Sequence, residues 1–146
     1  KNISAFYGRS MRLGAYGDPA AVPFRVWFAI IRYGKIEYYT GYTHQASHKN
    51  FDPALASLCM ISADTPKQAL KHHSQGQRSF RVKTPGAPLL PNEIECLSDT
   101  EGLHCIDCKL CDGTGKNKVN IAINVHGSRQ SRYAAKYETI NTRALL

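Results

Sequence analysis

The 146-residue chain carries a formal net charge of +8 at pH 7, and 42% of its residues are hydrophobic against 21% charged. This composition excludes a disordered chain, and the length fits one globular domain over 1–146. The longest apolar run, VWFAII at 26–31, is far shorter than the roughly 18 residues needed to cross a bilayer, so no membrane span is predicted. The opening KNISAFYGRS lacks the apolar core of a secretory leader, which predicts a cytoplasmic protein; a start at Lys1 instead of a methionine predicts a processed, cut or incomplete end.

Strand and helix signals alternate along the chain. The predicted elements, in order, are a strand over 11–15, a helix from Pro23 that ends at Gly34, a strand over 35–44, a short apolar segment over 54–64, a helix after the cap Thr65, a strand over 78–83, a Pro-rich loop over 84–93 and a strand over 118–127. This alternation predicts an α/β fold with a mostly parallel sheet. Because a complete eight-unit barrel takes about 200 residues or more, we expect an open sheet or a partial (β/α) barrel.

Four polar residues follow predicted strands. They are Asp18, His44, Asp64 and His126. Ligand-binding residues of parallel sheets gather at the carboxyl ends of the strands, so these four predict a nucleotide or small-molecule site on one rim. The alternative is that the aspartates cap turns before proline and that the histidines are ordinary surface residues.

The strongest signal is the cysteine spacing of HCIDCKLCDGTG, residues 104–115. Cys105, Cys108 and Cys111 form C-x2-C-x2-C, and Cys96 lies nine residues before the first of them. Four thiolates this close in sequence predict one metal centre in an embedded loop over 96–118. Four-cysteine zinc would be a closed structural site, whereas the triple spacing is typical of a 4Fe–4S cluster; free or disulfide-linked thiols are the third possibility.

Two smaller features accompany that loop. Gly113 and Gly115 supply permissive backbone directly after the third cysteine. The remaining cysteine, Cys59, lies in the apolar stretch LASLCMISA and is predicted to be a small buried residue.

Basic residues outnumber acidic residues by nineteen to eleven, which suggests an anionic partner such as nucleic acid; the alternative is a basic surface whose charge only keeps the chain soluble. Most are scattered, but the stretch 128–146 collects them in a predicted basic C-terminal helix or tail. Its candidate nucleic-acid contacts are Arg129, Arg132 and Lys136. The same stretch also fits an amphipathic helix that packs Tyr133, Tyr137 and Ile140 on the core.

Six blocks carry a resemblance through roughly residues 10–127: RLGAYGDPAAVP, YTGYTHQ, CMISADTPKQA, RSFRVK, CIDCKLCDG and NIAINVHG. In this order they resemble a family of largely uncharacterised bacteriophage and plasmid proteins, which is more distantly similar to proteins related to the radical-SAM partial barrel. The resemblance implies a partial barrel and a protein of a mobile element in the host cytoplasm. Family members usually carry further cysteines upstream, whereas this chain has none before Cys59. A radical-SAM-type reaction is therefore not implied, and zinc is preferred to an iron–sulfur cluster.

Two classes of function remain. The first is a metal-binding protein of a phage or plasmid type with a ligand site on the strand rim, where catalysis stays open. The second is a non-enzymatic, zinc-stabilised module that binds nucleic acid or a host nucleoprotein complex, for example against host defence. The sequence predicts no oligomeric state.

Overall fold

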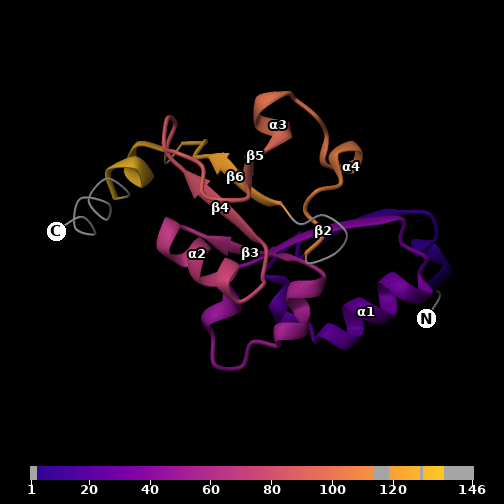
Figure 1. The fold of residues 1–146 in the computed structure, drawn as a ribbon. Helices are drawn as coiled ribbons and strands as arrows, with labels where there is room; N and C mark the ends of the chain where they lie inside the picture. The colour runs from indigo at the N-terminus through magenta and orange to yellow at the C-terminus, as the bar shows by residue number, and fades with distance from the viewer. Residues whose placement is uncertain (1–2, 114–118, 129, 137–146) are drawn as a thin grey trace.

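Six strands form one open sheet in which every neighbouring pair is parallel, in the order β1-β2-β3-β4-β6-β5 (Figure 1). The computed structural model describes residues 3–113, 119–128 and 130–136. The strands are β1 (Ser10–Leu13), β2 (Tyr38–Thr43), β3 (Met60–Ala63), β4 (Ser79–Lys83), β5 (Glu93–Glu95) and β6 (Asn120–Asn124). The predicted α/β class and parallel sheet are confirmed.

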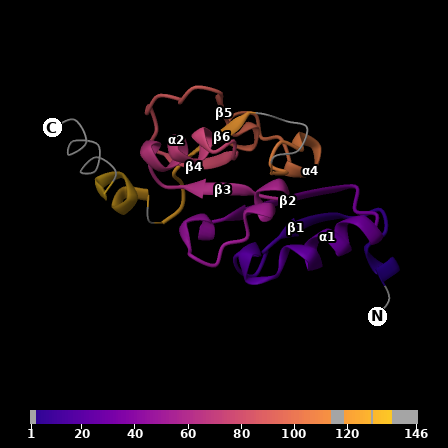
Figure 2. The ribbon, with the colours of Figure 1, turned by 60° about the horizontal axis from the view of Figure 1, so that its bottom comes forward.

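Helices lie on both faces of this sheet. The α-helices are α1 (Phe24–Tyr33), α2 (Pro66–Ser74), α3 (Leu97–Thr100) and α4 (Cys105–Cys108), and the 3-10 helices are η1 (Ile3–Phe6), η2 (Pro19–Ala21), η3 (Gln45–Ser47) and η4 (Pro53–Ser57). Figure 1 shows α1 and α2 below the sheet and the short α3 and α4 above it. Residues 130–136 form a further helix, which lies near the described end of the chain in Figure 2. Among all these helices of the described chain, none is long and apolar enough to cross a membrane.

Helix α2 begins and helix α1 ends where their capping residues predict, whereas α1 begins at Phe24, one residue after the predicted Pro23. The Thr65 side chain accepts a hydrogen bond from the Gln68 backbone N–H, and Pro66 occupies the first helical position of α2. This is the ordinary N-cap geometry, in which the cap oxygen satisfies an N–H that has no partner within the helix. Helix α1 ends at Gly34, whose N–H donates to the Ile30 carbonyl.

The structure corrects two of the predicted segments. The strand β5 lies at the end of the stretch predicted as a Pro-rich loop, so the sheet has six strands where about five were expected. Its sequence, EIE, is too short and too polar to show a strand period; Glu93 is nevertheless buried because it pairs with Arg81 (Nη2 to Oε2, 2.6 Å). The apolar segment over 54–64 begins as η4, so only Met60–Ala63 forms a strand.

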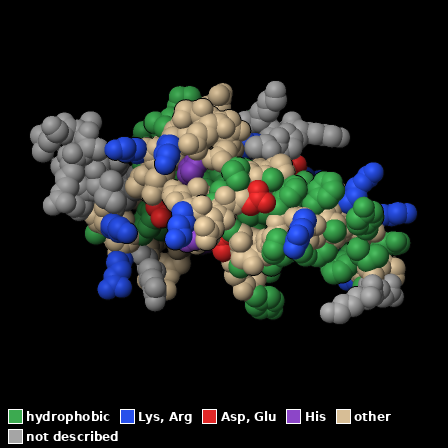
Figure 3. All heavy atoms as spheres, turned by 90° about the horizontal axis from the view of Figure 1, so that it is seen from below, with side chains coloured by type: hydrophobic (Ala, Val, Ile, Leu, Met, Phe, Trp, Pro, Cys, Tyr) green, Lys and Arg blue, Asp and Glu red, His purple; other side chains and the backbone are tan. Residues whose placement is uncertain are grey.

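The core lies at the centre of the sheet and thins toward the β1 edge. Met60, Ile61 and Ile121 are at most 1% exposed, whereas α1 contains no buried residue. The outer face of α1 exposes Phe28 and Tyr33, and Figure 3 shows hydrophobic side chains gathered on this part of the surface. The packed centre of the sheet is therefore the rigid platform on which a site is built.

Candidate functional site

A cavity of about 990 Å³ lies on the face of the sheet opposite α2. Strand β4 shows why. Ser79 points toward α2, where its hydroxyl meets the His73 ring (2.7 Å), so the alternating side chains of Phe80 and Val82 point to the other face and line the cavity. Tyr42 of β2 and Ile123 of β6 continue the same surface.

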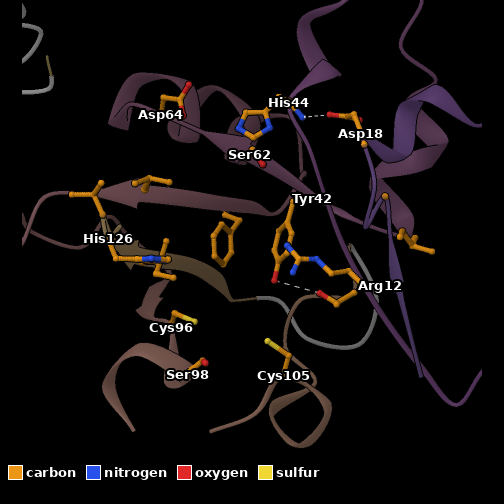
Figure 4. A pocket seen from close by; sticks show the side chains of 18 of the residues that line it. Arg12, Asp18, Tyr42, His44, Ser62, Asp64, Cys96, Ser98, Cys105 and His126 are labelled. Carbon is orange, nitrogen blue, oxygen red and sulfur yellow. Dashed lines mark hydrogen bonds between the residues drawn. The ribbon is translucent and has the colours of Figure 1, made fainter. Parts of the chain in front are cut away.

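All four residues predicted on the strand rim line this one cavity. They are Asp18, His44, Asp64 and His126, which follow β1, β2, β3 and β6. Figure 4 shows Asp18, His44 and Asp64 along one side of the cavity and His126 at one end. Because all strands are parallel, their carboxyl ends meet at one edge, and the four loops converge there.

Within the rim, Asp18 ties two loops together. One carboxylate oxygen accepts hydrogen bonds from the Ala20 N–H (2.9 Å) and the Thr43 hydroxyl (2.7 Å). The other oxygen accepts from the His44 N–H (2.8 Å). Asp18 therefore caps η2, as the alternative of a turn-forming residue before Pro19 predicts, and it also fixes the backbone that carries His44.

Asp64 and His126 are exposed at the mouth of the cavity. The Asp64 backbone is anchored on both sides, since its N–H donates to the Gln68 side chain and its carbonyl accepts from the Tyr133 hydroxyl (2.9 Å). The same hydroxyl reaches the Val82 carbonyl (3.0 Å). The helix over 130–136 thereby lies across the ends of β3 and β4 and forms part of the cavity wall.

The cysteines of the predicted metal centre reach the same cavity. Cys96 follows the last residue of β5, and Cys96 and Cys105 both line the cavity, on the side opposite Asp18 in Figure 4. Cys105 and Cys108 are the first and last residues of the one-turn helix α4, a spacing that places both on one helical face. Lys109 then turns the chain in a left-handed conformation (φ +56°). Cys111, 8% exposed, packs in a cluster with Met60 and Ile121 beneath the cavity.

Two of the four thiols, Cys111 and Cys108, lie in an environment that raises their pKa and so disfavours their charged form. The pKa of Cys111 is raised to about 12, mainly by burial. Charge on Cys96, Cys108 and Cys105 also raises this pKa, whereas a hydrogen bond from Tyr42 lowers it. Burial also raises the pKa of Cys108, as does charge on Cys96 and Cys105. The thiols are free, and no three His, Cys, Asp or Glu side chains within the described ranges converge closely enough to hold a metal ion as they stand.

The cysteine loop is held to the sheet by Arg78, a residue that the sequence did not single out. Its guanidinium is 6% exposed and pairs with Asp112 (2.9 Å). It also donates to three backbone carbonyls, those of Leu110 (2.6 Å), Gly113 (2.5 Å) and Val119 (2.8 Å). An arginine fork with this many donors fixes the course of the loop. The only sequence signal was its place as the first residue of the predicted strand RSFRVK.

Tyr42 links the cavity floor to the cysteine loop. Its ring packs on Phe80 (centroids 4.4 Å apart), and its hydroxyl accepts a hydrogen bond from Thr40 (3.4 Å) and contacts the Cys111 thiol. The Arg12 guanidinium lies over the same ring, 5.6 Å from its centroid. The signal that could have placed Tyr42 was its even spacing from Tyr38 and Thr40 in EYYTGYTH, which puts these three residues on one face of a strand.

The basic C-terminal segment is described in part. Arg132 and Lys136 are exposed, whereas Tyr133 is half-buried. Arg129, Tyr137, Ile140 and Gly115 lie outside the described residues. Nucleic-acid binding by this segment stays a prediction.

No family model, curated protein or solved structure matches this chain. The resemblance to phage and plasmid proteins therefore also stays a prediction.

Proposed function

We propose that the protein binds one metal centre through Cys96, Cys105, Cys108 and Cys111, and that this centre forms one wall of a cavity for a small molecule. Zinc is the preferred metal and a 4Fe–4S cluster is the alternative. The proposal assigns binding to the cavity and leaves catalysis outside its claim.

One observation carries the proposal: Cys96 and Cys105 line the same cavity as the four polar rim residues. A cavity of this size with a few polar side chains that converge on it is the usual form of a ligand site. Neutral thiols bind metal only after they lose their protons, so metal binding supplies the positive charge that this cluster of thiols lacks.

Four cysteine thiols are a suitable set of ligands for zinc or a 4Fe–4S cluster, although in the structure they do not yet converge on one point. Cys111 is fixed in the core, and its carbonyl accepts a hydrogen bond from the Gly41 N–H. Cys96 is fixed by its N–H, which donates to the Ala122 carbonyl (2.8 Å). Cys105 is exposed on the one-turn helix α4. Metal binding therefore requires the surface helix α4 to move toward two fixed thiols.

Metal analysis of anaerobically purified protein, together with its absorption spectrum, tests the proposal. We expect one zinc per chain and no visible absorption; iron, sulfide and a broad band near the visible edge would assign the cluster instead. Cys105→Ser and Cys108→Ser should each lose the metal. Cys59→Ala is the matched control, because the Cys59 thiol is buried and donates to the Leu55 carbonyl, away from the cavity lining. Stoichiometric metal that survives both serine variants unchanged contradicts the proposal.

A further inference from the structure

Arg12 projects from β1 into the cavity and has no carboxylate partner among the described residues. Figure 4 shows its side chain beside Tyr42 at the end of the cavity away from His126. Among the described residues that line the cavity it is the sole arginine, and lysine is absent from that lining. The ion pairs of the described chain join other residues, and the Arg12 guanidinium contacts the Tyr42 ring. Its N–H donors are therefore available to a ligand.

The negative charges of the cavity do not neutralise Arg12. The Asp18 carboxylate is occupied by three hydrogen bonds from its own loops. Asp64 lies at the exposed mouth, after β3, whereas Arg12 lies on β1, with β2 between those two strands. The cavity thus has one positive end and one polar end that carries Asp64, His44 and His126.

Between these two ends the floor is aromatic. The rings of Tyr42 and Phe80 lie 4.4 Å apart and tilted by 52°, and both line the cavity. Aromatic floors of this kind hold planar rings by stacking, and an arginine that lies over an aromatic ring is oriented for bidentate contact with an anion.

We propose that the cavity binds a nucleoside phosphate, with its phosphate on Arg12, its base on the Tyr42–Phe80 floor and the polar edge of the base toward Asp64 and His126. This rests on the proposed function, since it names the class of molecule for the same cavity. Phosphate is favoured over an uncharged ligand because the guanidinium has no anionic partner in the part of the chain that the structure describes. Base stacking is favoured over a simple inorganic anion because the floor offers ring faces and the cavity, about 990 Å³, is far larger than a phosphate.

Calorimetric titration of the metal-loaded full chain tests the inference, with adenosine and guanosine 5′-monophosphates, the matching nucleosides and inorganic phosphate as probes. We expect a monophosphate to bind at least tenfold more tightly than its nucleoside and than inorganic phosphate. Arg12→Gln should reduce monophosphate affinity to that of the nucleoside, and Arg12→Lys should restore part of it, since lysine keeps the charge but not the fork. Arg25→Gln is the control, because Arg25 is exposed on α1 and does not line the cavity. Thermal melts of each variant check that the exposed edge position tolerates the change.

The outcomes separate this inference from the proposal on which it rests. Equal affinity for monophosphate and nucleoside, or equal loss in the Arg12 and Arg25 variants, overturns the role of Arg12. No binding of any nucleotide to metal-loaded protein overturns the ligand class while the metal centre stands. Nucleotide binding to a wild-type protein that holds no metal upholds the inference and overturns the metal-bound wall.

Discussion

Replacement of Arg78 by alanine is the sharpest test of how the cysteine loop is held. The change removes a guanidinium that is 6% exposed and that contacts four partners, which are Asp112 and the carbonyls of Leu110, Gly113 and Val119. Breaking a buried ion pair by removal of one partner costs about 3–5 kcal/mol. Because Asp112 and parts of the loop reach water, which satisfies some of the freed carbonyls, we expect a loss of about 3–4 kcal/mol. A domain of this size has roughly 5–15 kcal/mol in total, so the loss is large.

Urea unfolding followed by circular dichroism measures this loss. With a slope of about 2 kcal/mol per M, the midpoint should fall by roughly 1.5–2 M. Arg78→Lys should fall about half as far, since an ammonium cannot reach partners on both sides as the fork does. Arg25→Ala, on the exposed face of α1, should stay within about 0.5 kcal/mol of the wild type. Competition with a chelator should show a 10- to 100-fold weaker metal affinity for Arg78→Ala, as for other residues that orient metal ligands.

The result that would refute this reasoning is an Arg78→Ala variant within about 1 kcal/mol of the wild type. The loop would then be held by its own backbone hydrogen bonds and by the burial of Cys111, and Arg78 would not contribute to its stability. A full loss of stability with unchanged metal affinity in the surviving folded fraction would refute the orienting role alone.

Three further predictions concern single contacts. Burial alone would raise the pKa of Glu93, but hydrogen bonds from Arg81 and a backbone N–H, and the charge of Arg81, lower it below 4.5. The ionised Glu93 therefore stabilises the fold above that pH, and this stabilisation is lost as the pH falls through the lowered pKa of the folded state. Glu93→Gln should accordingly flatten the fall of the urea midpoint at acid pH, measured from pH 2 to 6. Gly113→Ala should lower the melting temperature strongly, because at φ +81° a Cβ would lie 2.7 Å from backbone atoms. Gly86→Ala is the control: Gly86 has the same backbone angle (φ +80°) but no atom within 4 Å of the added Cβ, so it should lose only about 1 kcal/mol of stability. Equal melting temperatures for the two variants would contradict this. Tyr133→Phe removes the hydroxyl whose one proton is shared between two carbonyls at strand ends. Limited proteolysis should therefore cut the helix over 130–136 several-fold faster than in the wild type, and an unchanged rate would show that the hydroxyl does not hold it.

The sequence predicted the sheet because parallel strands leave a strong local signature. Caps such as Thr65, and glycine ends such as Gly34, are set by hydrogen bonds within a few residues, so their patterns carry over directly to the structure. The strand β5 was missed for the opposite reason. Glu93 is buried by a partner twelve residues away, Arg81, and no local pattern records that partner.

The convergence of the rim residues was predictable and that of the cysteines was not. Asp18, His44, Asp64 and His126 each follow a recognisable strand, and parallel strands share one edge. Cys96 follows β5, the strand that the sequence concealed, so its position on the same edge had no visible cause. The two predicted sites were therefore treated as separate, although they share one cavity.

Equal spacing also concealed how unequal the three clustered cysteines are. Cys105 and Cys108 begin and end one helical turn, whereas Cys111 follows a left-handed residue that redirects the chain into the core. The apolar cluster beneath Tyr42 holds Cys111 in place, and a surface helix of four residues carries the other two. A metal centre built from them would therefore connect one fixed thiol of the core to two thiols of a surface turn. We expect its metal affinity to depend on Arg78, which holds the loop to the sheet and which no cysteine spacing reveals.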